Sequence, residues 1–375
     1  MGVCQMKIVL SGVNLVEGGP LKIFLDVVDE FSKSGHELIC LINDRQLFKD
    51  KYPNNVKFIE FKYPKKFWLF RVFFEYHHAR RLCKKINPDV WFSLHDISPR
   101  LPDEVRQFVY CHNPSPFYNL TLRDLRFSKK FSLFSMFYKY LYGINIRKNE
   151  GVICQQSWIS EKFRVQYGIN NVVTCKPVPN LISNIVPDDL SLDSFEPNCG
   201  KLTLFYPTLP RTFKNIEILI DAVRYKPNIQ ERVNFVVTIS EEQGCYSRSL
   251  IEQAKGLPCF TFTGYLSRDQ VDRHYRDCDV VIFPSKLETW GLPITEAISN
   301  NKPVIVSDLP YAHETVGNYS SVAFIPVDNP EYLSQLIDKI LDGEQAFSKA
   351  TFNDDEQVIF GWDCLLNDII EGNNV

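Results

Sequence analysis

The stretch VIFPSKLETWGLPITEAI, residues 281–298, constrains the fold of this chain more than any other. Its apolar beginning predicts a buried strand, and Pro293 favours the start of a helix, because proline lacks the N–H that would have no partner there. The start of such a helix presents free N–H groups and the positive end of the helix dipole. Glu288 in the loop and Glu296 in the first helical turn are eight positions apart. A diphosphate lying on the helix start would therefore have a carboxylate toward each end.

Short apolar runs alternate with stretches of helical periodicity along the whole chain, which predicts βαβ units and parallel sheets. The expected strands are residues 6–11, 37–42, 56–61, 89–94, 105–111, 151–154, 202–206, 233–239 and 259–263. Three later helices are expected: one capped by Ser267 and Gln270, one with a buried stripe ending at Leu341, and one at 356–370.

A chain of 375 residues is too long for one ordinary core, so two domains are expected. Four prolines and little periodicity between residues 172 and 200 favour a linker there. We therefore expect a first domain at 1–180, a linker at 181–200, a second domain at 201–355 and a last helix at 356–375 that crosses back to the first domain.

Gly18 and Gly19 form a turn between the first strand and a stretch of helical spacing. Strand, glycine-rich turn and helix are the phosphate-handling arrangement of an α/β sheet, although a tight turn alone would also need glycine. The turn lacks the G-x-G-x-x-G pattern, so a nicotinamide cofactor is not indicated.

The stretch at 281–298 resembles the Glu-x7-Glu signature of retaining glycosyltransferases of family 4 (glycosyl transferases group 1). The match continues with an apolar strand, two acidic residues, a glycine and a helix: residues 302–306, Asp308, Glu314, Gly317 and the run that ends at Leu341. This resemblance implies an α/β architecture of the GT-B type, with two Rossmann-like domains facing each other across a cleft.

The resemblance also implies roles for residues of the second domain. Glu296 is expected to accept hydrogen bonds from the ribose hydroxyls of the donor, and Glu288 is expected to contact hydroxyls of the donor sugar. Backbone N–H groups near the helix start are expected to hold the distal phosphate: those of Thr289, Trp290, Gly291 and Leu292. Tyr265 and Leu266 occupy the positions at which the family binds the base through its backbone.

Two cations are expected to grip the donor phosphates, Lys214 and Arg211, because both lie in the corresponding loop of the family. Arg211 departs from the family pattern, in which the arginine lies five or six positions before the lysine, where this chain has Leu209 and Thr208. Arg211 therefore either reaches the same phosphate from a different backbone position or is structural.

His112 follows the expected strand 105–111, and the histidine at this position in the family faces the donor sugar. We expect it to hydrogen-bond a sugar hydroxyl or a phosphate oxygen. A lone histidine is more often structural, but the position of His112 at a strand end favours a role in the site. His95 and Asp96, at the end of strand 89–94, are weaker candidates. The triplet Asp277-Cys278-Asp279 precedes a buried strand, so we do not interpret it as a metal site; no metal and no cofactor are predicted.

Charge is distributed unevenly: residues 1–180 contain 27 Lys and Arg against 16 Asp and Glu, although the whole chain has a net charge of −3. Segments 62–85 and 123–148 combine most of these basic residues with phenylalanine, tyrosine and tryptophan, which favours an anionic lipid surface. The alternatives are aromatic residues in the core with solvated charges, or nucleic acid, for which no known module is present.

Eleven cysteines without regular spacing indicate a reducing compartment. No uninterrupted apolar run is long enough to span a membrane. We therefore expect a cytoplasmic, metal-independent hexosyltransferase that is peripheral on the inner face of the cell membrane. It would move a sugar from a UDP-, GDP- or dTDP-sugar to a lipid-linked glycan, such as an O-antigen or capsule repeat unit. The alternatives are a sugar-nucleotide epimerase on the same fold and a non-catalytic scaffold of an assembly complex.

Overall fold

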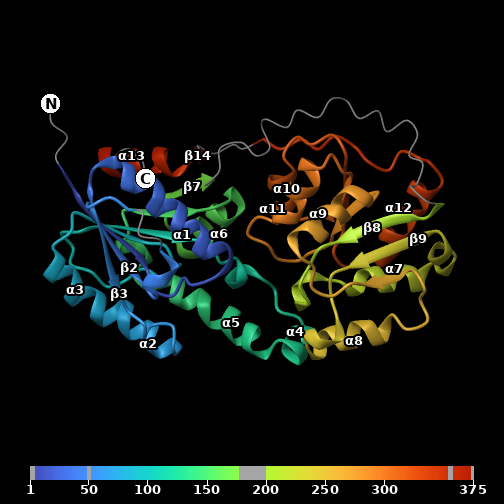
Figure 1. Cartoon of the computed structure of the whole chain (residues 1–375), viewed down its shortest axis with the longest axis horizontal. Coiled ribbons are helices and arrows are strands. Elements are labelled where there is room, and N and C mark those ends of the chain that lie inside the picture. The colour runs from blue at the N-terminus through green and yellow to red at the C-terminus, as the bar shows by residue number, and fades with distance from the viewer. Residues whose placement is uncertain (1–4, 49–51, 177–199, 354–357, 373–375) are drawn as a thin grey trace. The chain divides into compact units, whose positions relative to one another are not determined.

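The computed structural model describes residues 5–48, 52–176, 200–353 and 358–372 (Figure 1). The expected linker at 181–200 lies outside the described residues, apart from its last residue. The chain divides by its contacts into two units. Unit 1 consists of Met1–Phe117, Met136–Pro179 and Asp354–Val375, and unit 2 consists of Tyr118–Ser135 and Asn180–Asn353.

Unit 1 is built on a parallel sheet of eight strands in the order β14-β7-β6-β5-β4-β1-β2-β3. The strands are β1 (Lys7–Gly12), β2 (Glu37–Ile42), β3 (Val56–Glu60), β4 (Val90–Ser93), β5 (Arg106–Cys111), β6 (Gly151–Cys154), β7 (Val172–Lys176) and β14 (Val358–Phe360). Parallel pairing places the carboxyl ends of all strands at one edge, so the loops after β1, β4 and β5 meet there.

Helices cover both faces of this sheet, so successive side chains of β1 are buried on alternate faces. Ile8 and Leu10 belong to one hydrophobic cluster, and Val9 belongs to another. The first cluster contains side chains of α1 (Gly18–Phe31) and α13 (Trp362–Glu371). The opposite face is covered by a π-helical turn (Phe74–His78), α3 (Ala79–Ile86), α5 (Lys129–Gly143) and α6 (Ser157–Tyr167), while α2 (Trp68–Phe73) precedes the π-helical turn and has no buried residue. The contacts assign Lys129–Ser135 of α5 to unit 2 and the remainder to unit 1.

Unit 2 is built on a parallel sheet of six strands in the order β10-β9-β8-β11-β12-β13. Its strands are β8 (Leu202–Tyr206), β9 (Val233–Val237), β10 (Phe260–Phe262), β11 (Val280–Phe283), β12 (Val304–Ser307) and β13 (Val322–Ile325). Its helices are α4 (Leu122–Phe127), α7 (Glu217–Tyr225), α8 (Cys245–Gln253), α9 (Arg268–Asp277), α10 (Leu292–Ser299), α11 (Pro310–Val316) and α12 (Pro330–Leu341). Because β8 and β11 are neighbours, the loops that follow them meet at the carboxyl edge of the sheet.

The structure corrects three sequence predictions. Residues 172–176, at the start of the stretch that favoured a linker, form β7 and pair with β6. Helix α10 begins at Leu292 rather than Pro293, so Glu296 is its fifth residue and lies beyond the first turn. The expected helix at 356–370 begins only at Trp362, because Val358–Phe360 form β14 and pair with β7. The capping box of Ser267 and Gln270 is confirmed at the start of α9. No helix in the described part of the chain has both the length and the apolar character needed to cross a membrane.

Candidate functional site

The loops after β8 and β11 bring Lys214 and Glu288 together in unit 2. Lys214 ends a short 3-10 turn, Thr212–Lys214, and its ammonium forms an ion pair with the Glu288 carboxylate. The Lys214 Nζ also lies 5.0 Å from the centre of the Phe283 ring. Both charged side chains are only 15% exposed, so each supplies the other with a partner of opposite charge away from bulk water.

The backbone on either side of this pair is held by hydrogen bonds. The Tyr206 hydroxyl donates to the Lys214 carbonyl at 2.6 Å, and the Lys286 N–H donates to the Phe213 carbonyl at 2.7 Å. Asn215 adopts a left-handed φ of 56°, which ends the 3-10 turn, and its side-chain amide donates to the Val327 carbonyl at 2.8 Å. The loop that carries Lys214 is therefore tied to the loop that carries Glu288.

Glu296 extends from α10 toward α9, where both of its carboxylate oxygens have a partner. One accepts a hydrogen bond from the Arg268 guanidinium, and the other accepts one from the Tyr275 hydroxyl at 2.7 Å. Burial and the neighbouring Glu296 raise the pKa of Tyr275, so its hydroxyl remains a donor. Each carboxylate oxygen still has a lone pair available for a ligand hydroxyl. No sequence pattern indicated that Arg268 and Tyr275 would contact Glu296.

Gly291 explains how the backbone enters α10. Its φ of 85° is left-handed, and a Cβ there would lie 3.2 Å from the Ile294 side chain and 3.4 Å from Phe283. The preceding residue, Trp290, is anchored by the Thr315 hydroxyl, which donates to its carbonyl, and by its own indole N–H, which donates to Thr295 at 2.9 Å. The backbone that leads into α10 through Trp290 and Gly291 is therefore held in one conformation.

The remaining predicted residues of unit 2 are more exposed. Tyr265 is 85% exposed and Leu292 is 61% exposed, while Leu266 is half-buried. Arg211 is exposed, and within the described ranges its side chain has no hydrogen bond or ion pair. Asp279 holds β8 and the start of β11 together, because its carboxylate accepts the Thr203 N–H at 2.8 Å.

In unit 1, His112 lies at the carboxyl end of β5 beside Asp96. Asp96 has a left-handed φ of 73° and accepts the backbone N–H groups of His112 at 2.8 Å and of Asn113 at 3.2 Å. The Asp96 carboxylate is also 3.5 Å from the His112 Nδ1 and accepts the Tyr142 hydroxyl at 3.0 Å. Asp96 therefore orients the His112 loop. Gly18 and Gly19 are exposed at the start of α1.

His95 belongs to a buried cluster next to Asp96. Its Nε2 lies 3.0 Å from the Ser11 hydroxyl and 3.5 Å from the Glu75 carboxylate, and Arg71 donates to its carbonyl. Burial lowers the pKa of His95 well below the usual range, and burial raises the pKa of Glu75 to about 8. The Arg71 guanidinium faces this cluster rather than solvent.

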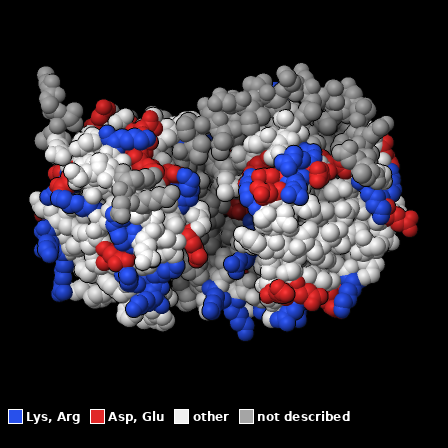
Figure 2. All heavy atoms as spheres, in the orientation of Figure 1, with Lys and Arg blue, Asp and Glu red and all other residues white. Residues whose placement is uncertain are grey.

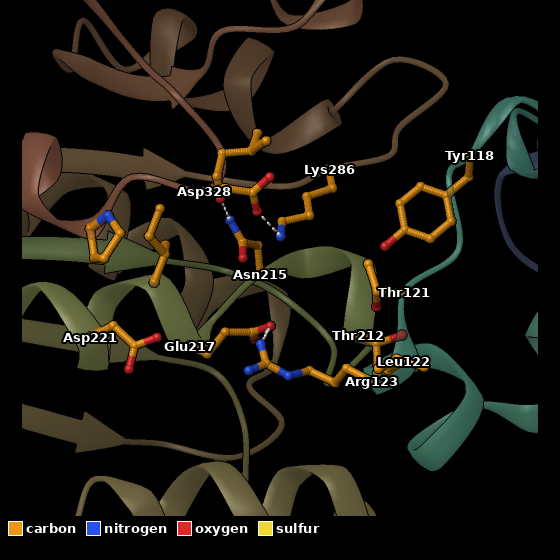
Figure 3. A pocket seen from close by; sticks show the side chains of 13 residues that line it. Tyr118, Thr121, Leu122, Arg123, Thr212, Asn215, Glu217, Asp221, Lys286 and Asp328 are labelled. Carbon is orange, nitrogen blue, oxygen red and sulfur yellow. Dashed lines mark hydrogen bonds and ion pairs between the residues drawn. The ribbon is translucent and has the colours of Figure 1, made fainter.

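A cavity of about 430 Å³ lies beside the Lys214 loop in unit 2 (Figure 3). Thr212 and Asn215, on either side of Lys214, line it, but none of the predicted site residues does. Tyr118 and Arg123 form part of its wall, and Lys286 pairs with Asp328 there. Most of the charged groups that line the cavity are already paired with each other.

Comparison with known proteins relates the chain to glycosyltransferases. Residues 193–354 match the family model "Glycosyl transferases group 1". The chain is 26% identical over 162 residues to an uncharacterized glycosyltransferase of Methanocaldococcus jannaschii, a match covering 42% of this chain and 40% of the relative. It is 30% identical over 108 residues to the O-antigen chain mannosyltransferase RfbU of Salmonella typhimurium, covering 27% and 30%. The chain thus spans less than half the length of these curated relatives.

Solved structures show the fold. The sucrose-phosphate synthase of Thermosynechococcus elongatus superposes with a TM-score of 0.62 at 14% identity, covering 90% of each chain. The Anabaena protein HepE in complex with UDP-glucose gives a TM-score of 0.57 at 15% identity, covering 92% of each chain. WaaG, a glycosyltransferase involved in lipopolysaccharide biosynthesis, gives 0.56 at 14% identity, covering 89% of this chain and 90% of WaaG. The chain therefore has the GT-B fold, and its residues 193–354 match the glycosyl transferases group 1 family model.

Proposed function

We propose that this protein is a retaining, metal-independent glycosyltransferase that moves a sugar from a nucleotide diphosphate sugar to a lipid-linked glycan. The observation that carries this proposal is the Lys214–Glu288 pair, held beside the start of α10 within the glycosyl transferases group 1 domain. A cation and the start of a helix, both at the carboxyl edge of one sheet, are the groups that bind a diphosphate.

The pair also explains how a donor would be recognised. A bound diphosphate would offer Lys214 a second anionic partner, and Glu288 would then be available to accept hydrogen bonds from sugar hydroxyls. Glu296, held by Arg268 and Tyr275, would present its remaining lone pairs to the ribose hydroxyls. Arg211 is an exposed cation on the same loop as Lys214 and would supply further charge to the phosphates.

In the front-face mechanism that we propose, the acceptor hydroxyl attacks from the side on which the nucleotide leaves, which retains the configuration at the anomeric carbon. In this mechanism a donor phosphate oxygen takes the proton of the acceptor, while Lys214 and the start of α10 stabilise the negative charge on the departing diphosphate. His112, fixed by Asp96, would hydrogen-bond the donor sugar or a phosphate oxygen.

A lipid-linked acceptor is supported by an exposed apolar surface on unit 1, which we name the α2–α5 surface. Its members are Phe67, Trp68, Leu69, Phe70 and Phe73 near or on α2 and Met136, Phe137 and Tyr140 on α5, each between 46% and 65% exposed. The two helices are linked because Arg71 donates to the Tyr138 hydroxyl at 3.1 Å. In Figure 2, Lys and Arg side chains border uncharged surface in the region of α2.

Exposure of this extent is unusual for a surface without a partner, and flanking lysines favour an anionic lipid headgroup. Lys65 and Lys66 are exposed immediately before α2. We propose that the α2–α5 surface holds the protein at the inner face of the cell membrane, where a lipid-linked acceptor is available. Arg71 does not contribute to it, although the sequence placed it within the basic segment, because its guanidinium faces His95 and Tyr138.

A thermal-shift panel of UDP-, GDP- and dTDP-sugars tests the donor proposal. A ligand at one hundred times its dissociation constant stabilises the folded state by about 2.7 kcal/mol, which is enough to rank the donors. The variant Lys214→Ala should lose the shift. Its control is Lys226→Ala, which removes another lysine of unit 2 that pairs with an acidic residue, Asp338. No shift with any donor would refute the proposal, and turnover of the donor without acceptor would indicate an epimerase.

A further inference from the structure

The segment Tyr118–Ser135 precedes the expected linker by more than forty residues, yet its contacts group it with unit 2. We name it the arm. Its beginning is ordered by Asp124, whose buried carboxylate accepts the Thr121 N–H at 2.7 Å and the Tyr118 hydroxyl at 3.2 Å. Thr121 and Asp124 form a capping box at the start of α4, so the arm has a defined structure of its own.

The arm contacts the 3-10 turn that carries Lys214. Phe213, the residue before Lys214, lies with its ring centre 5.2 Å from that of Phe131 and 6.5 Å from that of Tyr118. The rings of Tyr118 and Phe131 are themselves 5.8 Å apart, so the three side chains form one aromatic cluster. The Thr212 hydroxyl adds a hydrogen bond to Ser128 at 3.4 Å.

A second contact fixes the helix that follows the turn. Arg123 forms an ion pair with Glu217, the first residue of α7, as Figure 3 shows. The Glu217 side chain is 7% exposed, and its other carboxylate oxygen accepts the Tyr246 hydroxyl at 2.5 Å. Because this carboxylate is nearly buried, removing Arg123 would leave a charge without its cationic partner and would disturb the start of α7.

The Lys214 loop is thus held on both sides. The loop after β11 holds the Phe213 carbonyl through the Lys286 N–H, and the arm holds the Phe213 ring and Glu217. We propose that Arg123 and Phe131 are positioning residues for donor transfer: they hold Lys214 and Arg211 where the donor phosphates bind. This inference depends on the function proposed above for the Lys214 loop.

Three variants of the full chain test the inference. Arg123→Ala and Phe131→Ala each remove one arm contact, and Arg126→Ala is the matched control, because Arg126 lies on the same helix and faces the Phe127 ring instead of Glu217. The first measurement is hydrogen–deuterium exchange of a peptide covering residues 207–216, without any ligand. We expect faster exchange in both test variants and unchanged exchange in the control.

The second measurement is steady-state transfer with the donor found by the thermal-shift panel. We expect the KM for the donor to rise about tenfold in Arg123→Ala and Phe131→Ala, because a small displacement of a phosphate contact is costly. The KM for the acceptor should stay unchanged, whereas general loosening of the fold would raise both. Arg123→Lys keeps the charge and should recover most of the donor affinity.

Unchanged exchange of the 207–216 peptide in both test variants would overturn the positioning role, as would an equal rise of both KM values. Failure of the wild-type protein to bind any sugar nucleotide would refute the proposed function instead. In that case the exchange measurement would still decide whether the arm holds the loop, since it requires no ligand.

Discussion

Lys214 forms an ion pair with Glu288, a residue that follows it by 74 positions in the chain. The pair forms because β8 and β11 are adjacent and parallel, so that the loops after them leave the sheet side by side. A half-buried ammonium and a half-buried carboxylate each pay less desolvation energy when they are together. The donor phosphates would enter a site in which the Lys214 side chain is already oriented by Glu288.

The role of Glu288 can be separated from that of Lys214 with Glu288→Gln. The substitution removes the partner of Lys214 without removing the cation, so the affinity for UDP, GDP or dTDP lacking a sugar should be unchanged or higher. Transfer should fall by about 100-fold, the order expected for one lost transition-state contact. Calorimetry with the nucleotide and initial rates with the sugar nucleotide make the comparison. Weaker binding of the bare nucleotide would show that Glu288 acts by holding Lys214.

A second prediction concerns the support of Glu296. Arg268→Ala removes a guanidinium that is 62% exposed, so the cost in stability should stay below about 1 kcal/mol. Without this partner the Glu296 side chain loses its fixed orientation, and donor affinity should fall by about three- to tenfold. Arg273→Ala is the control, since Arg273 is exposed on the same helix. Equal donor affinities in the two variants would remove Arg268 from the site.

The sequence predicted these two regions to different extents. The strand, loop and helix around Glu288 were readable because buried strands and a proline at a helix start leave strong local signals. The partners of Glu296 were not, since Arg268 and Tyr275 reach it from another helix and no local pattern encodes that contact. Nor did any pattern indicate that the arm groups with unit 2. Its aromatic residue types alone do not show whether these side chains contact solvent, lipid or protein.

The α2 segment shows a further reason for such failures. Aromatic and basic residues alternate there so densely that more than one face fits an amphipathic helix. Arg71 faces inward, where it donates to the His95 carbonyl and the Tyr138 hydroxyl. Both partners are distant in the sequence, so no local pattern separated Arg71 from the exposed basic residues around it. The short β14 was missed because three residues give too little periodicity to identify a strand.

Vesicle binding tests the α2–α5 surface. The double variant Lys65→Gln, Lys66→Gln should weaken binding to anionic vesicles by about 2 kcal/mol, or about 30-fold, because each lysine near such a surface contributes about 1 kcal/mol. Trp68→Ser should weaken binding also in 1 M salt, where charge is screened. Lys255→Gln in unit 2 is the control, since Lys255 is 67% exposed. Binding is measured by sedimentation with the vesicles. The proposal would be contradicted if the Lys65→Gln, Lys66→Gln double variant and Trp68→Ser both bound like the wild type.

The last prediction concerns the buried Glu75, whose two carboxylate oxygens have no hydrogen-bond partner in the described part of the chain. Burial raises its pKa from 4.5 to about 8, although the nearby Arg71 acts in the opposite direction. The folded protein therefore binds this proton more tightly than the unfolded chain. Between about pH 4.5 and pH 8 the folded state carries more protons, so the free energy of unfolding falls as the pH rises.

Glu75→Gln replaces the carboxyl group with a neutral amide of similar shape that does not titrate. The stability of the variant relative to the wild type should therefore increase with pH between about 4.5 and 8, by at most about 1.4 kcal/mol per pH unit, and then level off. His95 is present in both proteins, so its own contribution to the pH dependence cancels in the difference between them. Urea unfolding of both proteins at pH 5, 7 and 9 gives the difference directly. A difference that stays constant would mean that Glu75 is already ionised at pH 5 in the folded protein, with Arg71 and not burial controlling its charge.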